Sequence, residues 1–339
     1  MIRETAKKVI ETYAYARAGF LGNPSDGYFG KTISFSVRNF RARVILYPSA
    51  RLEIKLAKAD LPIFENLDEL CKVTRWRGYY GGIRIIQALI VRFVDYCRDL
   101  RIDLPDRNFT LEYESNIPQR LGMGGSSAII TAALRALMSY FEVIIPPEIQ
   151  ANVVLETETK ELGVPAGLQD RVIQAYEGLV YMDFRKDLIE SRGYGEYERL
   201  DPNLLPNVYV AYRTSLSEGT EVFHSDVKAR WLAGDPAIHQ AMKTWAGYAE
   251  EGRRCLLERH DKRLNELINA NFDLRARIYR ISDGNLEMVR TARAAGAAAQ
   301  FAGSGGAIVG TFEDDQMFER LKQALAAIGV AVIRPKVTP

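Results

Sequence analysis

At residues 117–128 the chain reads Ile117-Pro118-Gln119-Arg120-Leu121-Gly122-Met123-Gly124-Gly125-Ser126-Ser127-Ala128. Three glycines within four residues allow the backbone to turn several N–H groups toward one point. Apolar residues then recur at helical spacing from Ile129 to Phe141, so a helix is predicted directly after the glycines. The first N–H groups of a helix lack intrahelical partners, and its dipole favours negative charge there. The junction is therefore a candidate phosphate site.

Two serines, Ser126 and Ser127, follow the glycines, and their hydroxyls can contact a phosphate oxygen or a phosphate-bound Mg²⁺. No lysine precedes Ser126, so the stretch differs from the Gly-x-x-x-x-Gly-Lys-Ser/Thr phosphate loop. The alternative interpretation is a flexible turn in which a serine caps the helix. The stretch taken alone leaves both interpretations open.

Length and composition indicate an ordinary globular protein. The 339 residues suffice for about two domains, with 47% hydrophobic and 26% charged residues. A net charge of +2 gives no indication of a nucleic-acid or membrane partner. The three cysteines, Cys71, Cys97 and Cys255, are too few and too far apart for a disulfide framework or zinc site.

The location that these features predict is cytoplasmic. Widely spaced cysteines fit a reducing compartment. Residues 1–10 carry charges and lack the apolar core of a signal peptide. No apolar run approaches the ~18–20 residues of a transmembrane helix.

A polar turn follows the first predicted strand, which we expect at residues 12–22. The turn reads Asn23-Pro24-Ser25-Asp26-Gly27-Tyr28-Phe29-Gly30. The side chains of Asn23, Ser25 and Asp26 offer hydrogen bonds to the hydroxyls of a ligand. The alternative is a plain Asx-type turn, which needs no ligand.

Further strands are expected at residues 32–37, 42–47 and 108–114, and a half-exposed antiparallel strand at 52–56. Aromatic residues beside glycines at 76–82 open a predicted helix whose apolar face runs from Ile83 to Cys97. These aromatics form either a platform for a base or sugar, or a plug in the core.

A further helix is predicted at residues 148–162 and carries Glu156, Glu158 and Glu161. A Gly/Pro turn then leads to Asp170, at the start of another apolar-periodic stretch. Asp170 is either an N-cap or a general base at a helix start, and its position alone favours the cap.

The remaining chain divides near residue 200, because residues 185–206 read as a polar connection. A strand is expected at 207–212, mostly helices over 221–295, and a second glycine turn before a strand at 300–310. A helix at 314–327 and a strand at 330–333 finish the chain. The three histidines lack metal-ligand spacing and read as surface or capping residues.

Taken together and in this order, the segments resemble the signature motifs of the GHMP kinase family. The resemblance is carried by residues 17–26, 118–128 and 302–306, with 163–170 resembling the family's catalytic-aspartate segment. Several stretches look most like plant-type glucuronokinases, among them Gly22-Asn23-Pro24-Ser25-Asp26 and Ala166-Gly167-Leu168-Gln169-Asp170-Arg171-Val172.

The resemblance implies an α+β protein with the two-domain GHMP kinase fold. Residues 1–200 would form the ATP-binding domain, similar to ribosomal protein S5 domain 2 and containing a left-handed βαβ crossover. Residues 201–339 would form a ferredoxin-like domain, with ATP and substrate binding between the two. The implied reaction transfers the γ-phosphoryl group of ATP to a sugar hydroxyl, the anomeric hydroxyl of glucuronate or a related sugar.

The resemblance also implies a role for individual residues. Asp170 would be the catalytic base, and Arg17 would keep it ionised and stabilise transition-state charge. Ser127 would ligate Mg²⁺ with help from Ser126, and Glu158, twelve residues before Asp170, matches the acidic Mg²⁺ ligand. Glu156 and Glu161 are alternatives to Glu158. The remaining ATP-binding residues would be Gly122, Gly124, Gly125, Gly303, Ser304 and Gly305.

The substrate would be held by Asn23 and Asp26, with a sugar-acid carboxylate on an arginine. Candidates for that arginine are Arg38, Arg77, Arg171 and Arg213, because a guanidinium binds a carboxylate through two hydrogen bonds. Residues 213–219 depart from the turn of the plant enzymes, which leaves the sugar open. Alternatives are galactose, a heptose phosphate or a mevalonate-like acid as acceptor, or a non-catalytic sensor. We expect a monomer or homodimer.

Overall fold

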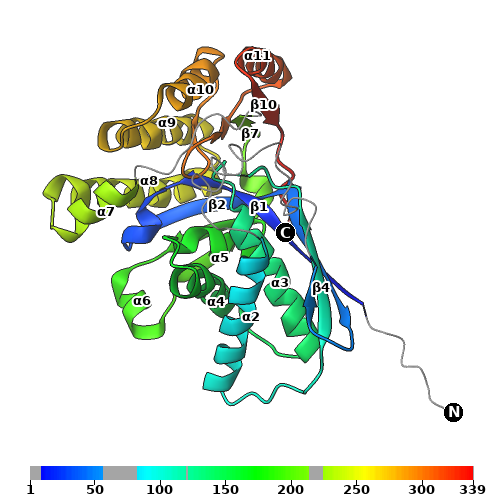
Figure 1. Cartoon of the computed structure of the whole chain (residues 1–339). Helices are drawn as coiled ribbons and strands as arrows, with labels where there is room; N and C mark the ends of the chain where they lie inside the picture. Colours follow the sequence, from blue (N-terminus) through cyan, green and yellow to red (C-terminus); the bar gives the residue numbers. More distant parts are fainter. Residues whose placement is uncertain (1–8, 56–81, 120, 214–223, 339) are drawn as a thin grey trace, which may run out of the picture. The chain divides into compact units, whose positions relative to one another are not determined.

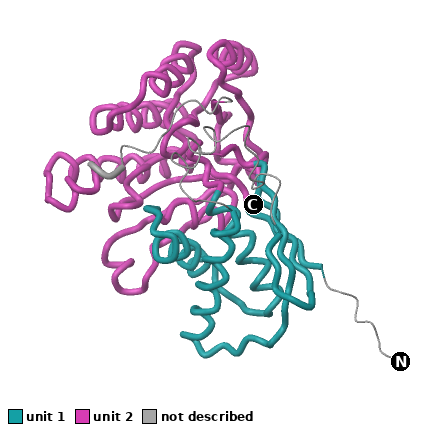
Figure 2. The backbone as a smooth tube through the Cα atoms, viewed as in Figure 1, with its two compact units in different colours: residues 1–14, 41–116, 126–166 teal, residues 15–40, 117–125, 167–339 magenta. Residues whose placement is uncertain are grey.

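A computed structural model describes residues 9–55, 82–119, 121–213 and 224–338 (Figure 1). Within it the chain divides into two compact units, which Figure 2 colours separately. Unit 1 takes its residues from 1–14, 41–116 and 126–166, and unit 2 from 15–40, 117–125 and 167–339. Two long strands, β1 (Ile10–Leu21) and β2 (Lys31–Pro48), contribute residues to both units.

In unit 1 the second half of β2 pairs antiparallel with β4 (Phe109–Ser115), from Ala42 opposite Ser115 to Pro48 opposite Phe109. The short strand β3 (Glu53–Ile54) pairs with the other edge of β4, in parallel. The expectation of an antiparallel strand at 52–56 is therefore wrong. β4 lies between β2 and β3 in the sheet. β3 and β4 both run opposite to β2, so they are parallel to each other.

The described helices of unit 1 are α2 (Gly82–Asp99), α3 (Gly125–Phe141) and α4 (Pro147–Glu156), followed by a π-helical turn, η3 (Thr157–Glu161). α2 packs against α4 and η3, with apolar residues such as Ile86 and Leu89 buried as the periodicity predicts. The helix predicted at 148–162 thus changes its winding after Glu156. Of the aromatic–glycine stretch at 76–82, residues 76–81 lie outside the described residues.

In unit 2 the first half of β2 pairs antiparallel with β5 (Leu179–Asp183), and β5 pairs antiparallel with β6 (Glu196–Leu200). A 3₁₀ turn, η1 (Ser25–Tyr28), follows β1, and α5 (Leu168–Tyr176) packs against β5. Two expectations are wrong here. β2 is continuous through Arg38 and Asn39. Residues 185–206 contain α6 (Lys186–Arg192) and β6, whose mostly charged residues hide the strand pattern.

The second sheet of unit 2 is antiparallel and has the order β10-β7-β9-β8. Its strands are β7 (Val208–Arg213), β8 (Gln300–Phe301), β9 (Ala307–Thr311) and β10 (Val330–Ile333). Numbered within this sheet the order is 4-1-3-2, with helices after the first and third strands, which is the ferredoxin-like arrangement. The predicted fold of the C-terminal half is confirmed.

The helices between β7 and β8 are α7 (His224–Leu232), α8 (Pro236–Glu258), α9 (Asp261–Ile278) and α10 (Asp283–Ala294), and α11 (Asp315–Ala326) precedes β10. Tyr209, Phe272, Met288, Ile308 and Leu321 form part of the core where sheet and helices meet. β6, which ends at Leu200, and β7 belong to different sheets. The domain boundary at 200 stays a prediction, because the two units are defined by contacts between residues and each is made of several separate stretches of the chain.

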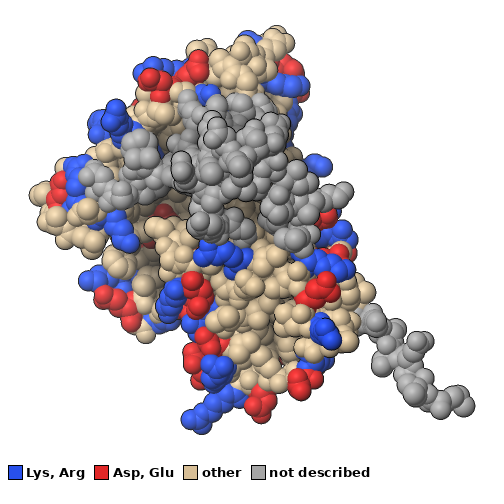
Figure 3. All heavy atoms as spheres, in the orientation of Figure 1, with Lys and Arg blue, Asp and Glu red and all other residues tan. Residues whose placement is uncertain are grey.

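Lysines and arginines are interspersed with acidic residues over the described part of the face drawn in Figure 3. This mixture agrees with the nearly balanced charge of the sequence. No described helix combines the length and the apolar character needed to cross a membrane.

Candidate active site

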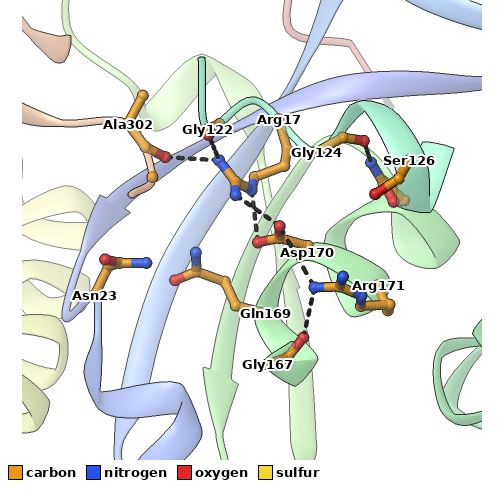
Figure 4. Close-up of polar contacts among 12 residues, drawn as sticks. Arg17, Asn23, Gly122, Gly124, Ser126, Gly167, Gln169, Asp170, Arg171 and Ala302 are labelled. Carbon is orange, nitrogen blue, oxygen red and sulfur yellow. Dashed lines mark hydrogen bonds and ion pairs between the residues drawn. The ribbon is translucent and has the colours of Figure 1, made fainter. Parts of the chain in front are cut away.

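Arg17 on β1 joins three segments that are far apart in the sequence (Figure 4). Its Nε and Nη2 donate to the two carboxylate oxygens of Asp170 at 2.7 and 2.6 Å. Its Nη1 donates to the carbonyl of Gly122 and, at 2.8 Å, to that of Ala302. The Arg17 residue is only 4% exposed, so these bonds are shielded from water. One side chain therefore connects the first strand, both glycine turns and the candidate base.

Asp170 is the third residue of α5, and the N-cap of that helix is Gly167. The capping interpretation of Asp170 is therefore wrong. Burial raises the pKa of the Asp170 carboxyl, but the positive charges of Arg17 and Arg171 and the hydrogen bonds from Arg17 outweigh it, so the pKa lies below the ordinary value. Arg171, whose Nη1 is 3.5 Å from Asp170 Oδ2, also donates to the Gly167 carbonyl at 2.8 Å. The carboxyl is ionised at neutral pH, as a proton acceptor must be.

The first glycine turn is held by its carbonyl groups. Arg17 binds the carbonyl of Gly122 through its side chain and that of Met123 through its N–H, at 3.1 Å for the latter. Gln174 Nε2 donates to the Gly124 carbonyl at 2.7 Å. The C=O and N–H of a trans peptide unit point in opposite directions. Fixing these carbonyls turns the N–H groups of the same units the other way, as the predicted phosphate site requires.

The two glycine turns touch each other, and their glycines make the contact possible. A Cβ atom on Gly303 would lie 2.1 Å from the Gly122 carbonyl oxygen and 2.8 Å from Arg17 Nη1. A Cβ atom on Gly122, whose φ is +60°, would lie 2.8 Å from the Ser304 nitrogen. The structure therefore brings the predicted ATP-binding residues Gly303, Ser304 and Gly305 to the first turn.

The predicted substrate residues Asn23 and Asp26 lie beside this group. Asp26 Oδ2 accepts a hydrogen bond of 3.4 Å from the N–H of Gln169 in the first turn of α5. Burial and the neighbouring charge of Asp170 raise the pKa of Asp26 to about 6. Asn23 is buried, and its Oδ1 accepts from Arg275 Nη1 at 2.8 Å. The side-chain carbonyl oxygen of Asn23 thus already accepts a hydrogen bond within the protein.

Arg213, the third predicted substrate residue, is placed differently. It ends β7, where its N–H donates to the Gly306 carbonyl at 3.1 Å and its Nη2 lies 3.7 Å from the Glu287 carboxylate. Within the described residues, the structure gives Arg213 no hydrogen bond or ion pair to Asn23, Asp26 or Asp170. Its contact with substrate stays a prediction.

The predicted metal ligands belong to unit 1. Ser126 Oγ donates to Glu158 Oε1 at 2.8 Å, and Glu158 is only 1% exposed. Ser127 is buried as well, and its carbonyl accepts a hydrogen bond from the Thr131 hydroxyl. The wider π-helical turn places Glu158 on the buried side, and such turns are frequent at functional sites. A hydroxyl and a carboxylate are oxygen donors that suit Mg²⁺.

Sequence reasoning missed three residues of the site. Gln174 supports the glycine turn, and Arg275 binds Asn23. Gln169 is fully buried, and within the described residues the nitrogen and oxygen of its side-chain amide have no hydrogen-bond partner of normal geometry. Figure 4 shows its side chain between Asn23 and Asp170. Arg275 gave no signal because it stands in a helix rich in charged residues, where most arginines are exposed.

A model of the GHMP kinases N terminal domain matches residues 88–178. Glucuronokinase 1 of Arabidopsis thaliana is 46% identical over 310 residues, which cover 90% of this chain and 85% of the relative. The chain belongs to the GHMP kinase family.

A second relative of this GHMP kinase, named Probable glucuronokinase 2 of Arabidopsis thaliana, is 48% identical over 308 residues, 89% of this chain and 84% of the relative. Among solved structures, Lactococcus lactis galactokinase complexed with galactose superposes with a TM-score of 0.75 at 15% identity, covering 97% and 94% of the two chains. That likeness shows the GHMP kinase fold over the length of this chain.

Proposed function

We propose that this GHMP kinase transfers the γ-phosphoryl group of ATP to the anomeric hydroxyl of glucuronate, giving a sugar 1-phosphate. The observation that carries the proposal is the ion pair of Arg17 and Asp170, which Arg17 also joins to both glycine turns. The acceptor is supported by the printed names of the two Arabidopsis relatives, both at 46% identity or more.

Asp170 accepts the proton of the attacking hydroxyl. Its pKa is held low by Arg17 and Arg171, so the carboxylate is ready to accept a hydrogen bond from the sugar at neutral pH. Transfer of a phosphoryl group depends mainly on positioning and on stabilising charge at the moving group. Arg17 therefore has two roles, orienting the base and contributing positive charge beside it.

The glycine turns bind the phosphates of ATP through backbone N–H groups, at Gly122, Gly124 and Gly125 and at Gly303, Ser304 and Gly305. Ser126, Ser127 and Glu158 would hold Mg²⁺, which neutralises phosphate charge when bound. Asn23 and Asp26 bind sugar hydroxyls, with Arg213 as a further candidate. We also propose a cytoplasmic enzyme that acts as a monomer or homodimer.

The test is an ADP-release assay with Mg·ATP over a panel of acceptors: glucuronate, galacturonate, glucose, galactose, mevalonate and a heptose phosphate. We expect ADP release to depend on glucuronate, with a sugar 1-phosphate as the product. A neutral sugar that outperforms every uronate would assign the enzyme to another acceptor. A folded protein that consumes no ATP with any acceptor would favour the sensor alternative.

A further inference from the structure

Three arginines of the described residues are almost completely buried: Arg17, Arg171 and Arg275, at 4, 7 and 3% exposure. The first two form ion pairs with the same carboxylate, that of Asp170. Arg275, on α9, has no carboxylate within ion-pair distance among the described residues. A buried guanidinium without an opposite charge is costly to a fold, so the missing partner needs an explanation.

Arg275 lies where the substrate turn meets the second glycine turn. Its Nη1 donates to Asn23 Oδ1 at 2.8 Å and to the Gly303 carbonyl at 3.0 Å. Its guanidinium carbon is 5.2 and 5.3 Å from the ring centres of Phe301 and Tyr279, which restrict its orientation. The side chain is thus held in place on one side.

The other side of the guanidinium is unused. Within the described residues, Nε and Nη2 of Arg275 donate to no acceptor. Other side chains have polar atoms that lack a partner and are sealed from solvent, but these two atoms do not belong to that group. These two N–H groups form the edge that binds both oxygens of a carboxylate in parallel. Burial lowers the pKa of Arg275, and the charges of Asp26 and Arg17 also act on it, in opposite directions.

The arginines predicted from sequence to bind a carboxylate are already paired or lie outside the described residues. Arg38 Nη2 is 2.7 Å from Glu177. Arg213 Nη2 is 3.7 Å from Glu287, too far for a hydrogen bond, but Nε and Nη2 of Arg213 are sealed from solvent. Arg171 pairs with Asp170, and Arg77 is not described. A second anion would have to compete for each paired guanidinium, whereas at Arg275 it would supply the missing charge.

We propose that Arg275 binds the carboxylate of the sugar acid through Nε and Nη2 and so determines the preference for an acid over a neutral sugar. This inference rests on the proposed function. Asn23 then has a defined part: its Oδ1 orients Arg275, and its Nδ2 remains for a sugar hydroxyl. The buried guanidinium of Arg275 forms an ion pair with a carboxylate only when the sugar acid is bound.

The test compares glucuronate with glucuronamide, which has the same shape without the charge, in the full-length wild-type enzyme and in Arg275→Gln. The wild type should prefer the acid. Arg275→Gln should raise KM for glucuronate by about 10- to 100-fold, the range for losing hydrogen bonds to a charged group. Its KM for glucuronamide should change far less, so the preference for the acid collapses.

The ratio of the two KM values separates recognition from damage to the site. Displacement of Asn23 and Gly303 would raise both KM values and that for Mg·ATP together, leaving the ratio as in the wild type. Arg275→Lys keeps the charge but loses the fork, so its ratio should be intermediate, and it serves if Arg275→Gln does not fold. The matched control is Arg277→Gln on the same helix, an exposed side chain that donates to the Asp273 carbonyl.

A wild-type enzyme that uses glucuronate and keeps its acid-to-amide ratio in both Arg275 variants overturns the inference and leaves the proposed function intact. Equal use of acid and amide by the wild type also overturns it. Failure of the proposed function looks different, because the wild type would then release no ADP with any sugar acid.

Discussion

Asp170 shows how a single residue acquires its role from neighbours. Both carboxylate oxygens accept from Arg17, and Arg171 adds a second positive charge. These interactions lower a pKa that burial alone would raise. The residue type supplies the acid, and the two arginines make it a carboxylate that stays ionised.

Asp170→Asn preserves the size of the side chain but removes its ability to accept a proton. We expect kcat to fall by about 10²- to 10⁴-fold, the usual contribution of a general base. The KM for Mg·ATP should change only a few-fold, because the phosphates are bound elsewhere. Steady-state ADP release measures both, and circular dichroism verifies the fold. Near wild-type kcat in a folded Asp170→Asn protein would remove Asp170 from the mechanism.

Asp26 is the opposite case, a carboxyl whose pKa is raised, from 3.8 to about 6. Between about pH 4 and 6 the native state therefore binds a proton that the unfolded chain has released. The contribution of this carboxyl to the free energy of unfolding is complete below pH 4 and is lost as pH rises through 6. Above pH 6 the protein holds an ionised carboxylate at a cost.

Asp26→Asn is neutral at every pH, so it removes that cost. Near pH 7.5 we expect its free energy of unfolding to exceed that of the wild type by about 1–3 kcal/mol, at 1.36 kcal/mol per pKa unit. Below pH 4 the difference in the free energy of unfolding between Asp26→Asn and the wild type should shrink. The Asp26→Asn variant should also phosphorylate the sugar more slowly than the wild type. Urea unfolding at the two pH values tests this, with exposed Asp103→Asn as the control. A variant less stable than the wild type at pH 7.5 would contradict the assignment.

At the scale of elements, the site depends on two loops that approach each other closely. The Gly303 position has room for hydrogen only, because the Gly122 carbonyl would lie 2.1 Å from an added Cβ. Backbone atoms cannot rotate away as a side chain does. The close approach is therefore a property of the pair of turns and of Arg17, which binds both of them.

Gly303→Ala should separate the turns and raise KM for Mg·ATP by roughly tenfold or more, the equivalent of about 1.4 kcal/mol. Gly247→Ala in α8 is the matched control, since nothing lies within 4 Å of its added Cβ and alanine favours a helix. The assay is an ATP titration at saturating sugar. Equal KM values for the two variants would show that the contact between the turns does not support ATP binding.

The π-helical turn Thr157–Glu161 is the second element with a defined role, because it buries Glu158 beside Ser126. Glu158→Gln removes the negative charge and keeps the shape. We expect the Mg²⁺ concentration for half-maximal activity to rise roughly 10- to 100-fold, as for other losses of metal-site groups. Glu156→Gln and Glu161→Gln serve as controls. A larger shift in either control would move the metal ligand to that glutamate.

At the scale of the whole molecule, ligand binding should couple to unfolding. A ligand that binds only the native state stabilises it by about 2.7 kcal/mol at a concentration of 100 Kd. Mg·ATP should therefore raise the melting temperature by several degrees, and Mg·ATP with a non-reactive sugar analogue should raise it further. Differential scanning fluorimetry with and without EDTA measures this. An unchanged melting temperature at millimolar Mg·ATP would contradict an ATP site.

Local features of this chain could be predicted from sequence because their causes are local. Gly122 and Gly124 adopt positive φ angles that favour glycine, and both are visible as glycines in the sequence. The periodicity of residues 83–97 predicts α2, and its buried face confirms it. Two of the wrong predictions, an antiparallel strand at 52–56 and a polar connection at 185–206, concern which strand lies beside which. The strand that pairs with β3 or with β6 cannot be predicted from the few residues of either strand.

By itself, the sequence determined the glycine turns, most helices and strands, and the family resemblance, because these depend on residue types at short spacing. Only the tertiary structure decided which charged and polar side chains lie beside each other. Arg17 and Asp170 are 153 residues apart, and Arg275 and Asn23 are 252 apart. Burial and Coulomb interactions depend on distance in space and on the exclusion of water, so the low pKa of Asp170, the raised pKa of Asp26 and the unpaired charge of Arg275 appear only once the chain is folded.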